Sequence, residues 1–377
     1  MLKEYFKELF HNFTKSKLIT KIFIFLFIAI EIFILVISFV TVDYTILTPG
    51  YLTDAKAMVA VDTENDRGYV LTVSVTEYTN PSIIQYWLAL NEDRVLLTEN
   101  QEDDLSAEQN DQYGIISKKI AINNAIINAY EKASLIDSNI KLVKEFKGML
   151  VAIVYANSDT DIYPDDVITE IQGVKVTSKE VFYNEYYRLL GENRQGAILK
   201  EGDSIEFTVL RFNKELKKDV EIKKSAKIYK NANGTLSIGL SLYEYVEVDG
   251  QNSSPQFGFL YNEHLDAKGG SGGAMMALSI YNALLKDDIT KVNDKSLIIA
   301  GTGTIDVDGN IGAIGGIEQK IIKALMSKVD IFYVDEYDYD EAIKACKKHG
   351  FDDSIVVSVK TFDDIINDLN ERRSTNE

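Results

Sequence analysis

The longest apolar stretch of the chain runs from Ile22 to Val42 and contains one charged residue, Glu31. About 20 helical residues cross the hydrocarbon core of a bilayer, so this stretch predicts a transmembrane helix at residues 22–42. It is too long for the apolar region of a cleaved signal peptide, and no clear small-x-small cleavage site follows it. A carboxylate in mid-span is costly, so Glu31 either contacts a partner helix or is tolerated as a single polar residue.

Basic residues flank this stretch unevenly, since lysines precede it and the next basic residue after it is Lys56. Short loops rich in lysine stay on the cytoplasmic side of a membrane. Residues 1–21 are therefore predicted to be cytoplasmic, and the chain beyond residue 42 is predicted to lie outside the cell membrane. The preceding lysines are Lys3, Lys7, Lys15, Lys17 and Lys21.

Residues 44–136 mix strand-like alternation with turn-rich and helical patterns. We interpret this region as an extracytoplasmic shell that joins the membrane helix to a later domain and packs with it. Its expected elements are a strand at Tyr69–Val75, a segment at Ser82–Leu90 with the only tryptophan, Trp87, an acidic loop at Glu99–Asp111, and a helix at Ile120–Ser134.

Residues 137–226 predict a compact β-rich domain with one helix. Ser178 is a candidate N-cap for a helix that runs to Leu190. The expected strands are Gly148–Val154, opened by its glycine, a pair joined at a glycine turn within Pro164–Val176, and Ser204–Arg211 with Leu216–Lys223. This order of elements resembles a PDZ domain.

Ser271 lies among four glycines, and apolar residues with helical spacing follow it from Ala274 to Leu285. The serine is therefore expected at or just before the N-terminus of a helix. Backbone N–H groups there are unsatisfied and the helix dipole is positive, so they can stabilise an oxyanion. Taken alone, the same pattern also fits a serine cap after a flexible linker.

A second helix is expected after Gly315 and Gly316, with Lys320 at the margin of its apolar face. A lysine with an ordinary pKa near 10.4 is a poor base at neutral pH, but burial lowers that pKa. Lys320 can then accept the proton of a serine hydroxyl. The competing interpretation is a lysine whose stem follows the helix edge while its charge stays in water.

The overall composition removes several classes of function. The chain has 58 acidic and 40 basic residues and a net charge of −18, which argues against nucleic-acid binding. Its single cysteine, Cys346, cannot form an intrachain disulfide. Its three histidines lie far apart and no His-Glu-x-x-His motif occurs, so no metal site is expected. No phosphate-binding Gly-Lys-Ser/Thr loop occurs, so ATP binding is not expected. No other cofactor is expected either.

Two blocks resemble the proteolytic domain of Lon. Ala300–Asp306 and Ile314–Lys320 are close to the lysine block of that family, and Gly270–Gly273 matches its serine block more loosely. The family usually has proline and alanine on either side of the serine, where this chain has Gly270 and Gly272. The whole chain resembles the membrane-anchored, PDZ-containing Lon-like serine proteases of Gram-positive bacteria.

This resemblance implies a multidomain α/β (α+β) fold, with a PDZ domain at 137–226 and a Lon-type proteolytic domain at 235–370. It implies an ATP-independent serine endopeptidase at the cell surface that cleaves exported or membrane-proximal proteins and peptides, and a possible ring-like homo-oligomer. Ser271 would be the nucleophile, Lys320 the base, and Thr302 the residue that orients Lys320. The backbone N–H groups of Ser271 and Gly272 would form the oxyanion hole.

A PDZ domain binds a peptide as an added strand and holds its C-terminal carboxylate in a glycine-led loop. The residues that would form this groove are Gly148, Met149, Leu150, Phe182 and Tyr186, with Leu189 beside them. The aromatic residues among them also fit simple core packing.

Three alternatives remain open. A Ser–His–Asp triad would need His264 with Asp266 or Asp306. Lys268 is a second possible base, although it lies in a flexible stretch three residues before the serine. In the third alternative, the chain is a PDZ-based binding or scaffold protein at the membrane, and its protease domain is inactive or nearly so.

Overall fold

The computed structural model describes residues 2–15, 17–63, 67–101, 105–191, 196–231, 233–260, 267–293 and 295–374. The fold is mixed α/β, as expected from the sequence, and one apolar helix lies near the N-terminus. The chain divides into two compact units. The N-terminal unit contains residues 1–48 and 76–102, and the main unit contains residues 49–75 and 103–377.

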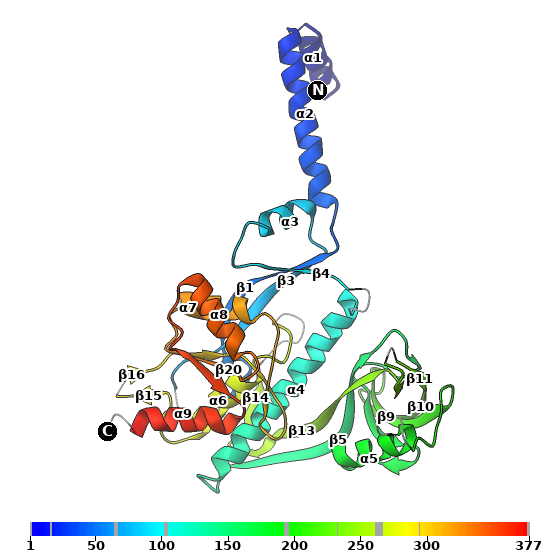
Figure 1. Cartoon of the computed structure of the whole chain (residues 1–377), viewed down its shortest axis with the longest axis vertical. Coiled ribbons are helices and arrows are strands. Elements are labelled where there is room, and N and C mark those ends of the chain that lie inside the picture. Colours follow the sequence, from blue (N-terminus) through cyan, green and yellow to red (C-terminus); the bar gives the residue numbers. More distant parts are fainter. Residues whose placement is uncertain are drawn as a thin grey trace. The chain divides into compact units, whose positions relative to one another are not determined.

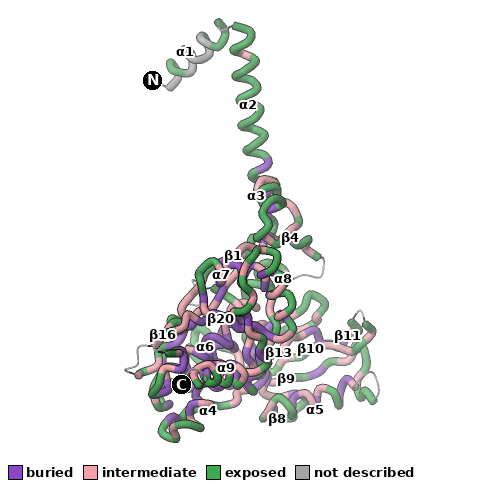
Figure 2. The backbone as a smooth tube through the Cα atoms, turned by 60° about the vertical axis from the view of Figure 1, so that its left-hand side comes forward, coloured by how far each residue is buried: buried purple, intermediate pink, exposed green. Residues whose placement is uncertain are grey.

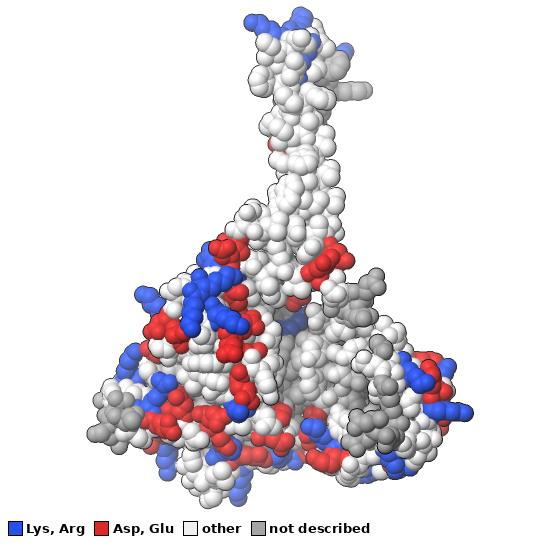
Figure 3. Space-filling view, viewed as in Figure 1, with Lys and Arg blue, Asp and Glu red and all other residues white. Residues whose placement is uncertain are grey.

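In the N-terminal unit, α1 (Leu2–Lys15) is followed by α2 (Leu18–Phe39), which is long and apolar enough to cross a membrane. Apart from the buried Ile37 near its C-terminal end, α2 is mostly exposed, and its surface is almost free of charge (Figures 2 and 3). The predicted bounds 22–42 were displaced toward the C-terminus. The helix takes in Lys21 and ends at Phe39, because Val40 adopts an extended conformation and the chain turns away.

A strand pair and a short helix also belong to this unit. The first residues of β1 (Tyr44–Asp54) pair antiparallel with β4 (Leu96–Glu99). The short helix α3 (Ile83–Ala89) lies inside the predicted turn-rich segment. Its N-cap, Ser82, forms a capping box with Gln85, which explains why a helix begins there.

The main unit contains a sheet in which the strand order is β21-β20-β17-β3-β1. Strands β3, β17, β20 and β21 run parallel. Side chains alternate between its two faces, with Ile331 and Tyr333 in one core and Phe332 and Val334 in the other. The bounds are β3 Val70–Thr79, β17 Ile299–Gly301, β20 Ile331–Asp335 and β21 Val356–Val359.

Helices cover both faces of this sheet, as parallel sheets require. Helices α4, α6 and α9 contribute to one core, and α7 and α8 contribute to the other (Figure 1). Their bounds are α4 Ala107–Ser134, α6 Gly273–Leu284, α7 Ile317–Met326, α8 Tyr339–His349 and α9 Phe362–Ser374.

Helix α4 begins earlier in the chain than the sequence pattern indicated. Residues 99–111 were predicted as a loop, but α4 already begins at Ala107 and continues through the predicted helix at 120–134. Ser106 and Gln109 form a capping box that starts it. The first turns are exposed and lack apolar periodicity, so the pattern revealed only the buried later part.

A second sheet has the order β13-β5-β7-β9-β10-β6, with β8 on β7. The helix α5 (Lys179–Leu190) packs on it, and Ser178 caps this helix as predicted by accepting a hydrogen bond from the N–H of Val181. The strands are β5 Lys141–Val154, β6 Asp159–Thr160, β7 Val167–Ile171, β8 Val174–Lys175, β9 Ser204–Asn213, β10 Lys218–Lys227 and β13 Leu240–Ser254.

The sequence indicated that Gly148 begins a strand. In the structure it lies within β5 instead. It has a φ of 142°, and the pairing of β5 with β13 shifts register between Phe146 and Gly148. A Cβ atom there would lie 2.2 Å from the carbonyl oxygen of Ile168, so the neighbouring strand requires glycine.

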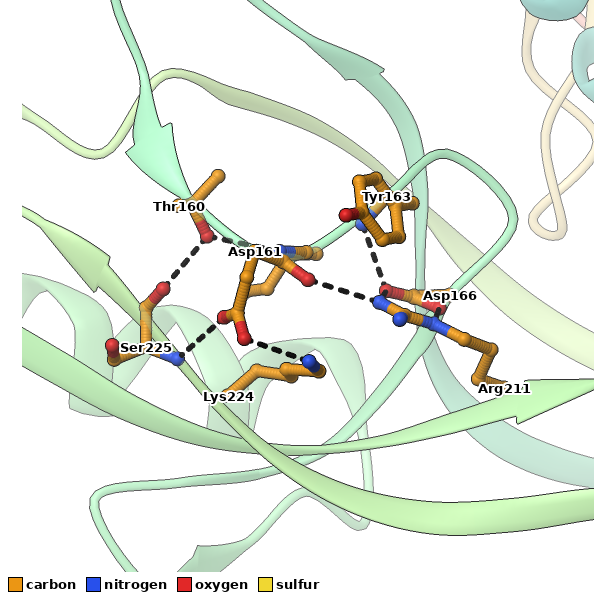
Figure 4. A network of polar contacts seen from close by, with 8 residues as sticks. Thr160, Asp161, Tyr163, Asp166, Arg211, Lys224 and Ser225 are labelled. Carbon is orange, nitrogen blue, oxygen red and sulfur yellow. Dashed lines mark hydrogen bonds and ion pairs between the residues drawn. The ribbon is translucent and has the colours of Figure 1, made fainter.

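A polar network joins the segment around β6 to β9 and β10 (Figure 4). Arg211 donates two hydrogen bonds to the carboxylate of Asp166, at 2.7 and 2.6 Å. Asp166 is almost fully buried and also accepts from the N–H of Tyr163 at 2.8 Å. Asp161 binds Lys224 at 2.7 Å. The pairing and the hydrogen bonds offset the cost of burying the Asp166 carboxylate.

The remaining strands are short and form pairs or edges. They are β2 Val59–Val61, β11 Tyr229–Lys230, β12 Leu236–Ser237, β14 Phe257–Phe259, β15 Lys291–Val292, β16 Lys295–Ser296, β18 Thr304–Ile305 and β19 Ile311–Gly312.

Candidate active site

Ser271 lies in the turn immediately before α6, whose N-cap is Gly272. The position predicted from the sequence is therefore confirmed. The carbonyl of Ser271 accepts a hydrogen bond from the N–H of Gly303 at 2.7 Å, and the N–H of Ala274 donates to the carbonyl of Gly303 at 3.2 Å. These two bonds fix the serine turn against the segment that follows β17.

Close packing around the serine turn explains why glycines follow the serine. A Cβ atom on Gly272 would lie 2.9 Å from Cγ2 of Thr72, and one on Gly273 would lie 3.0 Å from the backbone nitrogen of Ile305. The first contact explains why this chain has glycine where the resemblance leads one to expect alanine. The turn approaches β3 and β18 too closely for side chains.

Lys320 lies in the first turns of α7, which begins after Gly316 as predicted. The sequence placed Lys320 at the margin of the apolar face. Its side chain is instead 3% exposed and lies inside the protein. Ile317 and Ile321 on the same helix are fully buried, which shows that α7 turns this whole side toward the sheet.

Thr302 connects Lys320 to the serine turn. The Nζ atom of Lys320 donates to Oγ1 of Thr302 at 3.2 Å, and Oγ1 donates to the carbonyl of Ser271 at 3.2 Å. Because the threonine proton is committed to that carbonyl, the hydroxyl can only accept from the lysine. The lone pair of a neutral Lys320 therefore stays available for another proton.

Burial lowers the pKa of Lys320 from 10.5 to about 8. Asp338 opposes this shift, since its negative charge favours the ammonium form. Asp338 is itself buried, which raises its pKa, and its carboxylate accepts a hydrogen bond from the N–H of Ile314 at 2.8 Å. Near pH 8 about half of the Lys320 side chains are neutral and can act as a base.

Ser271 and Lys320 line the same cleft, which has a volume of about 220 Å³. Residues 53–75, Lys118 of α4, residues 267–269 and α6 supply the other walls. The cleft is lined by Thr53, Met58, Thr72, Val73, Ser74, Val75, Lys118, Ala267, Lys268, Gly269, Ser271, Gly272, Met276 and Lys320.

The backbone at the serine turn leaves two donors available. The N–H of Gly273 donates to the carbonyl of Gly270 at 3.1 Å. Among the residues that the structure describes, the N–H groups of Ser271 and Gly272 donate to none. These are the two groups that the sequence indicated as an oxyanion hole, and they lie at the N-terminus of α6.

The sequence reasoning missed Lys118, a second buried lysine in this cleft. It is 5% exposed, and its Nζ donates to the carbonyl of Ala267 at 2.7 Å. Lys118 lies on the same side of α4 as Ala121, Ile122 and Ala125, which are buried. That helical spacing was the available signal, because it places a lysine in line with core residues.

Helix α4 also secures the segment next to Thr302. Asn124 donates to the carbonyl of Ile305 at 2.9 Å, and Asn128 donates to the carbonyl of Asp306 at 2.8 Å. Through these two buried side-chain amides, α4 holds the segment that follows Thr302 in place.

The alternative catalytic residues are placed differently. The ammonium group of Lys268 forms an ion pair with Asp111. His264 and Asp266 lie outside the described residues. The carboxylate of Asp306 accepts hydrogen bonds from Asp308 and Asn310 within its own turn. Within the described ranges, no group of histidine, cysteine, aspartate and glutamate side chains is arranged to hold a metal ion.

The residues predicted to form a peptide groove are buried within and beside the second sheet, except for Tyr186, which is partly buried. Met149 and Leu150 are fully buried, and Phe182 is 1% exposed. Burial raises the pKa of Tyr186 to about 12. Gly148, Met149 and Leu150 pair with residues 243–245 of β13 on one side of β5, and β7 occupies the other side. A peptide can pair with this part of β5 only after β13 has left it.

A scan against models of known protein families found no match, and a search of curated proteins found no similar sequence. Function must therefore be inferred from the residues themselves and from their geometry.

Proposed function

We propose that this protein is an ATP-independent serine endopeptidase that uses Ser271 as nucleophile and Lys320 as general base. One observation carries the proposal. Lys320 is buried, has a lowered pKa, and is hydrogen-bonded through Thr302 to the backbone of Ser271. Both reactive side chains line one cleft. A buried amine beside a serine at a helix N-terminus is an arrangement suited to acyl transfer.

The reaction begins when neutral Lys320 takes the proton of the Ser271 hydroxyl as the oxygen attacks a peptide carbonyl. The N–H groups of Ser271 and Gly272 stabilise the resulting oxyanion. Protonated Lys320 then returns the proton to the leaving amine, and an acyl-enzyme forms. Water, deprotonated by Lys320, releases the second product and restores the serine.

The proposed protease corresponds to a Lon-type proteolytic domain at 235–370, together with residues from the region 44–136. Two contacts support this association. Strand β3 pairs with β17, and α4 packs against α6. Residues 137–226 would be the PDZ domain, and β13, which follows it in the chain, pairs with the proposed peptide-binding edge of β5.

The proposed location is the cell membrane, with α2 as a single span, the N-terminus in the cytoplasm and the protease outside. The apolar helix α2 and the lysines before it support this orientation. Substrates would then be exported or membrane-proximal proteins and peptides, and self-association into a ring would be compatible with this placement.

The test is cleavage of casein, an unstructured protein, by the purified full chain in detergent without ATP. Ser271→Ala and Lys320→Met are expected to abolish cleavage, whereas the control variants Ser279→Ala on α6 and Lys323→Met on α7 should retain it. If the wild type and Ser271→Ala cleaved casein to the same low extent, a Ser271-dependent protease would be refuted and a binding role favoured.

A further inference from the structure

The short helix α3 presents an apolar face outward. Ile84, Trp87 and Leu88 have the i, i+3, i+4 spacing that places side chains on one side of a helix. Trp87 is 50% exposed and Leu88 is 71% exposed, and Leu90 after the helix is also exposed. The buried Ala89 lies on another side of α3 and faces the protein.

Hydrogen bonds hold α3 at the end of α2. The N–H of Ile83 donates to the carbonyl of Val40 at 2.9 Å, and the N–H of Val42 donates to the carbonyl of Pro81 at 2.9 Å. The rings of Tyr44 and Tyr86 lie 4.9 Å apart. Within the N-terminal unit, α3 therefore lies across the foot of α2 (Figure 1).

The apolar face of α3 lies next to the apolar surface of α2, where Val36, Phe39 and Val40 are exposed and only Ile37 is buried in this last part of the helix. The charges nearby do not fit attachment to an anionic surface. Residues 76–101 carry four carboxylates and one arginine, so any electrostatic contribution would be repulsive at anionic lipids. These acidic residues are Glu77, Glu92, Asp93 and Glu99, and the arginine is Arg94.

We propose that α3 binds the phospholipid bilayer, inserting Trp87 and Leu88 at the boundary between headgroups and acyl chains where α2 leaves the membrane. Tryptophan is favoured at this depth, and a helix with one apolar face lies in the plane of the interface. Insertion depends on the apolar face and needs no anionic lipid. This inference rests on the proposed span by α2.

The experiment uses Trp87 as the reporter, because it is the only tryptophan in the chain. The full chain is reconstituted into phosphatidylcholine vesicles, and emission is measured with lipids brominated near the headgroup or near the chain end. More of the emission should be lost with the shallow bromine than with the deep one, because tryptophan is favoured at the headgroup level. Adding anionic lipid or salt should change neither value.

Two variants sharpen the result. In Trp87→Phe/Thr98→Trp, the tryptophan is moved to an exposed position on β4 and should be quenched by aqueous iodide instead. In Leu88→Glu, Trp87 should lose most of its bromolipid quenching, because a carboxylate opposes insertion. Trp87 that is quenched by iodide and unaffected by bromolipid would overturn the inference.

Alkaline extraction of the same vesicles separates this inference from the proposed anchoring. A chain that stays in the vesicles while Trp87 remains in water contradicts the role of α3 alone. A chain released by alkali contradicts the span by α2 and the role of α3 with it.

Discussion

The Nζ atom of Lys320 lies 3.2 Å from Oγ1 of Thr302, and both side chains are almost completely buried. Since the threonine hydroxyl donates to the carbonyl of Ser271, it holds the lysine by accepting and leaves the lysine lone pair available. The threonine thereby orients the amine without adding a charge that would raise its pKa.

Replacing Thr302 tests this orientation. Thr302→Val keeps the shape but removes the acceptor, so kcat for casein cleavage should fall by roughly 10- to 100-fold through misplacement of the amine. Thr302→Ser keeps the hydroxyl and should retain most of the activity. Unchanged kcat in the valine variant would show that Lys320 is positioned by other contacts.

The pH dependence of cleavage follows from the lowered pKa of Lys320. The base must be neutral, so kcat/KM should rise with pH and level off above about 8, the pKa of Lys320. Asp338→Asn removes the charge that favours the ammonium form, so the rise should move to lower pH. Lys323→Met is the control and should leave the profile in place. A profile identical in wild type and Asp338→Asn would contradict the role of Asp338.

Burial of Lys320 should also be visible in stability. Its pKa is 10.5 when exposed and about 8 when folded, so between these values the unfolded chain binds more protons and stability rises with pH. Below pH 8 the folded protein bears the full cost of the buried charge. Lys320→Met should therefore stabilise the protein at pH 7 by up to roughly 3 kcal/mol, and the gain should shrink by pH 10. Thermal unfolding at both pH values measures it, and a destabilised variant would contradict the expectation.

The close approach of Gly272 to Thr72 predicts a rescue. Gly272→Ala places a Cβ atom 2.9 Å from Cγ2 of Thr72, and such overpacking costs roughly 1–3 kcal/mol. Activity and stability should fall, and the second change Thr72→Ser, which removes that methyl group, should restore them. Failure of the double variant to recover would mean that the turn needs glycine for its backbone.

The ion pair of Arg211 and Asp166, which is not part of the proposed catalytic cleft, predicts a large loss of stability when it is broken. Arg211→Met leaves the buried carboxylate without its partner and should destabilise the protein by roughly 3–5 kcal/mol. Lys224→Met breaks the pair with Asp161, a partner that is 56% exposed, and should cost less than about 1 kcal/mol. Urea unfolding of the two variants compares them, and equal losses would contradict the role of burial.

Much of the local structure could be predicted because its signals are short in sequence. The apolar run of α2, the cap at Ser178, the left-handed Gly316 before α7 and the glycine turn before α6 each act through neighbouring residues. A cap satisfies N–H groups two or three residues away, and helical spacing shows which side is buried. For this reason Ser271 was found at a helix N-terminus from its immediate neighbours alone.

Other features depend on residues that are distant in the sequence and meet only after folding. The sheet buries Lys320 more deeply than α7 alone indicates, and α4 brings Lys118 into the same cleft. The pairing of β13 with β5 covers residues that looked accessible for a peptide. The sequence by itself thus determined which residues have suitable chemistry and which helices they begin. Only the tertiary structure decided their burial, their partners and their pKa values, because those are set by long-range contacts.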